Sequence, residues 1–224
     1  MPLISGAKGV VETLKACTVE LVFGLTGHTV MEVADELDKD GRIRSIYPRS
    51  ELTGTYMAYG YNRIKAGAKS VCIWHVAGST YAAPVVMTAK IDSVPMVLVC
   101  GNVSSDCKGK QAFQETPIYE VFKPITKWAY RVERTDQLPW ALQLAIHTAS
   151  SYRPGPVVLD VPFDKFVEKA EMHIPKGPIE WVPPAGDLQA VKKACDSLLK
   201  AKKPILIAGG GVAISDAGYE AQRV

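Results

Sequence analysis

The chain has 224 residues, of which 47% are hydrophobic and 22% are charged, and its formal net charge at pH 7 is +3. This balance excludes an intrinsically disordered chain and is typical of a globular protein with one large or two modest domains. Basic residues are not clustered with aromatic ones, and no apolar run approaches the roughly 18 residues of a membrane-spanning helix, so we expect neither nucleic acid nor a membrane as a partner.

Short apolar strands alternate with amphipathic helices along the first 160 residues. The first helix is predicted to begin at Ser5, a residue type suited to N-capping. In chain order the hydrophobic pattern predicts a helix over 5–17, a strand over 20–24, a helix over 28–37, a strand over 42–47, a helix over 51–66, a strand over 70–75, a helix over 79–89, a strand over 95–101, a helix over 138–150, and a turn and strand over 154–160. This alternation predicts an α/β fold with a doubly wound parallel sheet and helices on both faces.

Proline-rich composition marks the end of this region. We predict a first domain over 1–172, a linker over 173–186 and the beginning of a second α/β domain over 187–224. The last segment is expected to contain a helix over 188–201 and a strand from Lys203 that runs into the loop Gly209–Gly211. One strand with one complete helix cannot bury a core, so we expect this domain to be incomplete, in a fragment or in a split-gene subunit.

The cysteines disfavour disulfides and zinc. They are odd in number and form no CxxC pair: Cys17, Cys72, Cys100, Cys107 and Cys195. Reduced thiols, no metal site and no secretory signal make a cytoplasmic protein the simplest interpretation.

A carboxylate, Glu51, lies where a predicted strand ends and a helix begins. Ligands of parallel α/β proteins bind at the carboxyl ends of the strands, which favours a functional role. A glutamate at a helix start can also merely complement the helix dipole. The spacing alone leaves both interpretations open and favours the second.

Several segments, in the same order and at compatible spacing, resemble thiamine-diphosphate enzymes of the acetolactate synthase-like family. The stretch that begins at Glu51 is similar to the family's "HEQGAxxMAxGYAR". Further matches are Val22–Gly27 to "VFGYPGG", Val94–Gly101 with Ala112–Glu115 to "IPMVxxxGxV…AFQE", Thr126–Trp128 to "TKW", and Arg153–Pro162 to "RPGPVxxDxP". The resemblance runs from about residue 5 to residue 165 and implies the pyrimidine-binding domain of such an enzyme.

The resemblance also implies roles for individual residues. Glu51 is expected to be buried and to donate a hydrogen bond to N1′ of the cofactor's aminopyrimidine, and His28, His75 and Gln114 are expected to face the substrate. The residues expected to bind cofactor are Leu25, Thr26, Gly27, Gly78 and Thr80 around the pyrimidine, together with Gly209, Gly210 and Gly211, which suit a nucleotide and possible FAD.

The "GDG…N" stretch with which the family holds Mg²⁺ and the diphosphate does not occur in this chain. The resemblance therefore implies an obligatory second subunit, either another copy in a homo-oligomer or a partner chain that carries the diphosphate-binding domain.

The chain departs from the family beside the reacting end of the cofactor, where it has Ser50, Leu52, Ala77 and Tyr81. Three functions therefore stay open. The first is a carbon–carbon lyase or carboligase that acts on a 2-keto acid such as pyruvate. The second is hydrolytic cleavage of a cyclic diketone, which the additional histidines His28 and His75 favour. The third is a catalytically silent assembly or regulatory subunit, which the retained Glu51 disfavours.

Overall fold

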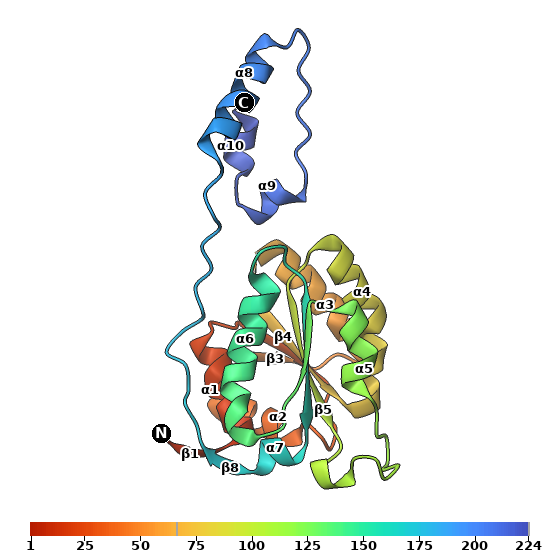
Figure 1. Cartoon of the computed structure of the whole chain (residues 1–224). Coiled ribbons are helices and arrows are strands. Elements are labelled where there is room, and N and C mark those ends of the chain that lie inside the picture. Colours follow the sequence, from red (N-terminus) through yellow and green to blue (C-terminus); the bar gives the residue numbers. More distant parts are fainter. Residues whose placement is uncertain (66, 224) are drawn as a thin grey trace. The chain divides into compact units, whose positions relative to one another are not determined.

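The computed structural model describes residues 1–65 and 67–223 (Figure 1). Its contacts divide the chain into two compact units, Met1–Trp181 and Val182–Val224. The first unit contains every strand of the described residues. Those strands are β1 (Leu3–Ser5), β2 (Leu21–Gly24), β3 (Arg44–Ile46), β4 (Ser70–His75), β5 (Met96–Asn102), β6 (Trp128–Arg131), β7 (Pro156–Pro162) and β8 (Lys169–Glu171).

Six of these strands form one parallel sheet in the order β3-β2-β4-β5-β7-β6. The central strands β5 and β7 are buried along their whole length, as expected of a sheet covered on both faces. The register pairs Val97 with both Val71 and Val157, so branched aliphatic side chains stack across the middle of the sheet. The prediction of an α/β fold with a parallel sheet is confirmed.

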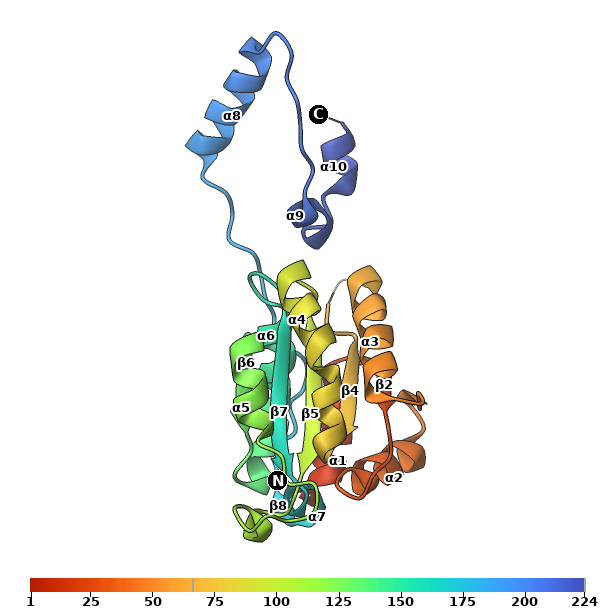
Figure 2. The same cartoon turned by 90° about the vertical axis from the view of Figure 1, so that its right-hand side faces the viewer.

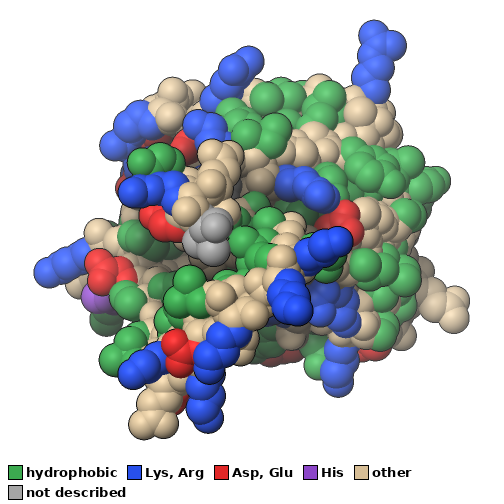
Figure 3. Space-filling view, turned by 90° about the horizontal axis from the view of Figure 1, so that it is seen from above, with side chains coloured by type: hydrophobic (Ala, Val, Ile, Leu, Met, Phe, Trp, Pro, Cys, Tyr) green, Lys and Arg blue, Asp and Glu red, His purple; other side chains and the backbone are tan. Residues whose placement is uncertain are grey.

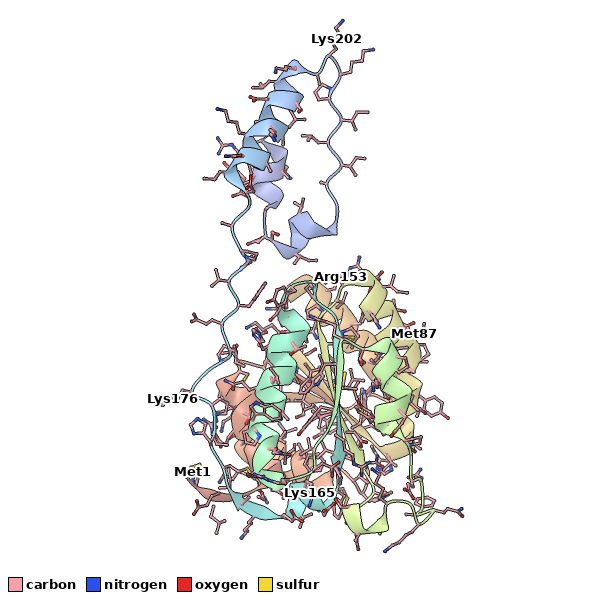
Figure 4. All side chains as sticks on the ribbon, viewed as in Figure 1. Met1, Met87, Arg153, Lys165, Lys176 and Lys202 are labelled. Carbon is pink, nitrogen blue, oxygen red and sulfur yellow. The ribbon has the colours of Figure 1, made fainter. Side chains whose placement is uncertain are left out.

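Helices cover both faces of the sheet (Figures 1 and 2). The helices that pack on the sheet are α1 (Gly6–Ala16), α2 (Met31–Asp40), α3 (Glu51–Lys65), α4 (Ala83–Asp92), α5 (Ile118–Phe122) and α6 (Leu138–Ser150). One hydrophobic core joins α1, α2 and α6 to the sheet, and a second core joins α3, α4 and α5 to the opposite face. The side chains between helices and sheet form this packed interior in Figure 4.

The start of α1 follows the prediction. Ser5 is the N-cap, and its Oγ accepts a hydrogen bond from the Lys8 backbone N–H at 3.3 Å. Residues 3–5 also pair antiparallel with β8. The short helix α7 (Asp164–Val167) precedes β8. Ala66, the last residue of the predicted helix over 51–66, lies outside the described residues.

Several predicted boundaries differ from the structure, and the differences shape the loops. The helix predicted from His28 begins at Met31, because the Val30 N–H bonds the Gly27 carbonyl at 3.0 Å and closes a turn first. The helix predicted from Ser79 is a 3₁₀ helix over Val76–Ala82, followed by α4, in which Pro84 lies in the first turn.

The second unit contains the helices α8 (Leu188–Lys200), α9 (Gly210–Ile214) and α10 (Gly218–Gln222), none of which has a buried residue. The strand predicted from Lys203 does not form, and the described residues of the second unit contain no other strand with which this segment could pair. Gly209 is the N-cap residue of α9, so the glycine triplet begins a short helix. On the face drawn in Figure 3, lysine and arginine side chains are interspersed with hydrophobic and polar ones.

Candidate active site

The predicted site residues of the first unit gather at the carboxyl edge of the sheet. His28 follows β2, His75 ends β4, and Gln114 lies in the long loop after β5. Glu51 is the first residue of α3, which comes after β3. Because β2, β4 and β5 are parallel and adjacent, their following loops meet at one edge, which is where ligands bind in open α/β sheets.

Glu51 is buried, with 8% of its surface exposed. Its carboxylate lies directly against Gly78 of the loop after β4, and a Cβ atom at position 78 would come within 2.0 Å of Glu51 Oε1. Gly54, one turn further along α3, lets the helix approach β4, since a Cβ there would lie 2.4 Å from the Trp74 ring. The glutamate is therefore shielded from water and close to a loop backbone that has no side chain to interpose.

Both ring nitrogens of His75 have a hydrogen-bond partner. Its Nδ1 lies 2.9 Å from Thr29 Oγ1, and its Nε2 lies 2.9 Å from Gln114 Oε1. Burial lowers the pKa of His75, the Gln114 contact and nearby Glu51 raise it, and His28 lowers it. A neutral imidazole at pH 7 follows, since even the ordinary histidine pKa is about 6.5.

His28 packs against the edge of His75. The two ring centroids are 4.6 Å apart at an interplanar angle of 72°. The ring centroid of His28 also lies 6.4 Å from that of Phe113, a side chain that is 77% exposed. Two imidazoles and an exposed aromatic ring thus lie side by side near Gln114.

The remaining predicted residues have different surroundings. Gly27 adjoins His75, because a Cβ at position 27 would lie 2.4 Å from the His75 ring. Leu25 and Thr26 line a small apolar cavity between the ends of β2 and β3. Thr80 donates its hydroxyl to the Ala77 carbonyl at 2.7 Å, a bond within its own turn. Gly209 to Gly211 belong to the second unit.

A cavity of about 530 Å³ opens beside the cluster, under the loop after β5. Its wall includes Gln114, Asn102 at the end of β5, and Arg131 at the end of β6. Gln114 therefore borders both this cavity and His75.

Sequence reasoning missed the polar groups that support these residues. Thr29 is fully buried between His75 and the Gly101 carbonyl, to which its hydroxyl donates at 3.2 Å. Asp160 on β7 accepts a hydrogen bond from Asn102 Nδ2 at 2.8 Å, and its burial raises the pKa of this carboxyl. A polar residue at the end of a predicted apolar strand, or directly after it, was the available signal for Asp160 and Asn102. Thr29 gave no such signal, because it lies inside the predicted helix over 28–37.

No group of three or more His, Cys, Asp or Glu side chains that could hold a metal ion occurs within residues 1–65 and 67–223. In the same residues, no helix is long and apolar enough to cross a lipid bilayer.

Comparison with known proteins gives a consistent result. Residues 4–121 match the family described as "Thiamine pyrophosphate enzyme, N-terminal TPP binding domain". The chain is 36% identical over 226 residues to the acetolactate synthase large subunit of Buchnera aphidicola subsp. Acyrthosiphon pisum, a match that covers 98% of this chain and 39% of the relative. It is 36% identical over 221 residues to the acetolactate synthase large subunit of Haemophilus influenzae, which covers 94% and 38%.

A third relative, the acetolactate synthase isozyme 3 large subunit of Escherichia coli, is 32% identical over 223 residues, with 94% of this chain and 38% of the relative covered. The chain thus spans less than half the length of the curated relatives that it matches. The matched family, the parallel sheet and the similarity along nearly the whole chain lead to one conclusion: this chain belongs to the thiamine pyrophosphate enzymes and carries their N-terminal TPP-binding domain.

Proposed function

We propose that this chain supplies the pyrimidine-binding part of a thiamine-diphosphate-dependent carbon–carbon lyase or carboligase that acts on a 2-keto acid such as pyruvate. The burial of Glu51 against Gly78 at the carboxyl edge of the sheet is the observation that carries the proposal. A buried carboxyl group is costly unless it is paired or used, so its presence in this position favours a ligand-directed role.

The cofactor, when bound, supplies the nucleophilic carbon that attacks a substrate carbonyl, while the protein positions and polarises the reacting groups. In the proposal, Glu51 holds a proton and donates a hydrogen bond to the pyrimidine N1′. Shielding from water strengthens such a bond and leaves the carboxyl fewer competing partners. Leu25, Thr26, Gly27, Gly78 and Thr80 would contribute to the wall around the ring.

His28, His75 and Gln114 would face the substrate on the other side of that wall. Their contacts support a shared role, because His75 adjoins both His28 and Gln114. A neutral imidazole can accept a proton, and the amide of Gln114 can either donate to or accept from a substrate oxygen.

The relatives extend beyond the segment that this chain matches. A region of that kind would hold Mg²⁺ and the diphosphate and would supply the rest of the enzyme. In the three comparisons above, the match covers 39% or less of the length of each large subunit. We therefore propose a homo-oligomer or a partner chain with a diphosphate-binding domain. FAD stays a prediction from the family resemblance. Residues 203–208, which lead into the short helix α9, do not form a strand.

The pair of histidines favours a second candidate, hydrolytic cleavage of a cyclic diketone by the same cofactor. His28 and His75 lie edge to face at 4.6 Å, and the lowered pKa of His75 leaves a neutral ring that can accept a proton from water. The third candidate, a silent subunit, predicts that the first unit supports no catalysis, whichever residue occupies position 51.

A chimaera tests these candidates. Residues 1–181 replace the matching N-terminal segment of a full-length acetolactate synthase large subunit, and the purified protein is assayed with thiamine diphosphate and Mg²⁺ for pyruvate consumption and for cyclic-dione cleavage. We expect cofactor-dependent activity that Glu51→Gln reduces by about 10²- to 10⁴-fold, the usual range for a lost acid–base group.

Glu171→Gln, an exposed acid of β8, is the matched control and should keep full activity. Pyruvate consumption supports the carboligase, and cleavage of the dione alone supports the hydrolase. Full activity of the Glu51→Gln chimaera would contradict the role of Glu51, and a folded but inactive parent chimaera would favour the silent subunit.

A further inference from the structure

We propose that Thr29 is a positioning residue that keeps the proton of neutral His75 on Nδ1, so that Nε2 is the ring atom that accepts a proton in the site. Only the use of Nε2 as a proton acceptor in catalysis rests on the proposed function. The position of the proton is a property of the first unit by itself.

The hydrogen bonds of Thr29 carry the inference. Thr29 Oγ1 lies 3.2 Å from the Gly101 carbonyl oxygen and 2.9 Å from His75 Nδ1. A hydroxyl has one proton, and a carbonyl oxygen can only accept. When Thr29 donates to Gly101, its oxygen can bond Nδ1 only by accepting, which requires a proton on Nδ1. Both bonds therefore coexist in one arrangement alone, the Nδ1–H form of His75.

The alternative arrangement gives up a buried bond. If Thr29 donated to His75 Nδ1, the Gly101 carbonyl would lose this donor in surroundings where Thr29 is 0% exposed and Gly101 is buried. An unmade hydrogen bond costs more in such a place than at the surface. The Nδ1–H form is therefore the favoured one.

Close packing holds Thr29 and the His75 ring against the backbone. A Cβ at position 101 would lie 2.8 Å from Thr29 Oγ1 and 2.5 Å from the Thr29 carbonyl oxygen. A Cβ at position 27 would lie 2.4 Å from His75 Cγ. Glycine at both positions allows Thr29 and the imidazole to approach the backbone more closely than any other residue would permit.

The surroundings of Nε2 can accommodate this nitrogen with or without a proton. His75 Nε2 lies 2.9 Å from Gln114 Oε1, which can accept a hydrogen bond from a protonated Nε2. When Nε2 carries no proton, rotation of the Gln114 amide by half a turn presents an N–H donor instead. Gln114 can thus follow the charge of His75, while the Thr29 contact stays the same in both states.

Two titratable groups act on the ring from neighbouring elements. His28 lowers the pKa of His75, and Glu51 raises it. The hydrogen bond at Nδ1 is made by Thr29, while His28 and Glu51 act on the ring through charge, so the position of the proton is left to the hydrogen bonds.

The test is the tautomer of His75 in the whole 224-residue chain, read by nitrogen NMR of ring-labelled histidine at about pH 8, well above the ordinary histidine pKa of about 6.5. His75→Gln assigns the signals by removing them. We expect a protonated-type resonance for Nδ1 and an unprotonated-type resonance for Nε2. The reverse pattern in the wild-type chain would overturn the proposal, whatever the variants do.

Substitutions at position 29 test the cause. Thr29→Val removes the hydroxyl and keeps the shape, and it should shift the ratio of Nδ1–H to Nε2–H by at least about tenfold toward Nε2–H, the effect of one ordinary hydrogen bond. Thr29→Ser should keep the wild-type pattern. Thr53→Val, at an exposed threonine of α3, is the control and should leave His75 unchanged.

An unchanged tautomer in a folded Thr29→Val chain would refute the role of Thr29. A Thr29→Val chain that fails to fold leaves the wild-type and Thr29→Ser patterns to decide. Because the signal needs neither cofactor nor substrate, failure of the proposed enzymatic function would leave this result intact, and the two failures can be told apart.

Discussion

At the scale of single residues, the loop after β4 combines a strained backbone with a close approach to a polar side chain. Val76, directly after His75, is fully buried and has a φ of 23°, a conformation that is rare for a β-branched residue. Strain of this kind costs about 1–3 kcal/mol and is concentrated at functional sites. Two residues later, Gly78 reaches the Glu51 carboxylate.

Gly78→Ala should therefore impair cofactor activation more than folding. The new methyl group would displace the Glu51 carboxylate, and a shift of about 1 Å at a reacting group can cost about 10²-fold in rate. The measurement is thiamine-diphosphate-dependent activity of the chimaera, with circular dichroism to check the fold. Gly60→Ala is the control, because nothing lies within 4 Å of its Cβ position in α3. It should keep activity and stabilise the helix by up to about 1 kcal/mol.

The depressed pKa of His75 predicts a pH dependence of stability. Below its ordinary pKa of 6.5, the unfolded chain binds a proton at His75 more readily than the folded chain does. The contribution of neutral His75 is thus present above that pH and is lost as the pH falls through the lower folded-state pKa. Denaturant titrations across this window should show a shallower acid decline for His75→Gln than for wild type. Equal slopes would contradict the prediction, and His173→Gln, at an exposed position, serves as control.

At the scale of elements, α3 is the helix that presents Glu51, and a buried asparagine holds it to the sheet. Asn62 Nδ2 donates to the carbonyls of Ser70 and Pro95, at 3.2 and 3.0 Å. Its Oδ1 accepts from the Ser70 N–H and hydroxyl, at 2.8 and 3.0 Å. One side chain thereby ties the end of α3 to the start of β4 and to the residue before β5.

Asn62→Ala should lower the free energy of unfolding by about 3 kcal/mol, because it leaves buried backbone groups of Ser70 and Pro95 without their partner. Urea unfolding monitored by fluorescence gives the value. On the same helix, Ile64 is 85% exposed, and Ile64→Ala should change stability by no more than about 0.5 kcal/mol. Similar losses for both variants would show that Asn62 is not the anchor.

One wrong helix boundary and one missing strand have separate causes. The predicted helix over 28–37 includes His28 and Thr29, which the structure places in a turn, because local periodicity does not register the bond between Val30 N–H and the Gly27 carbonyl. The strand β6 was not predicted, and its four residues are only partly buried. Short or edge elements give a weak hydrophobic pattern, since fewer of their side chains face the core.

At the scale of the whole molecule, the two units differ in how they are stabilised. Both hydrophobic cores belong to residues 1–181, and the helices of the second unit contain no buried residue. Most helical stability in proteins comes from packing of an apolar face, and α8 has such a face exposed, with Leu188 at 84% and Leu199 at 86%.

A chain shortened to residues 1–184 should therefore unfold cooperatively, with the same denaturant midpoint as the full chain. In the full chain, amide protons of 188–222 should exchange with solvent far faster than those of β5 and β7. A clear drop in the midpoint after truncation, or strong protection of α8, would show that the second unit contributes to stability.

The sequence by itself determined the α/β class, the order of the main elements and the candidate role of Glu51. Hydrophobic periodicity reports whether a segment buries one face or both, and the family resemblance covers the loops that follow the strands. The boundaries of α6 and β4 could be predicted because their apolar runs are long or continuous.

Only the tertiary structure decided which loops meet. Thr29 and His75 are 46 residues apart in the chain, and His75 and Gln114 are 39 apart, yet both pairs are in hydrogen-bonding contact. Such contacts depend on the strand order, which places β2, β4 and β5 side by side, and on glycines that admit close approach. Neither is encoded in a local pattern, because strand order results from the packing of the whole sheet and the clearance at a glycine depends on what lies opposite it.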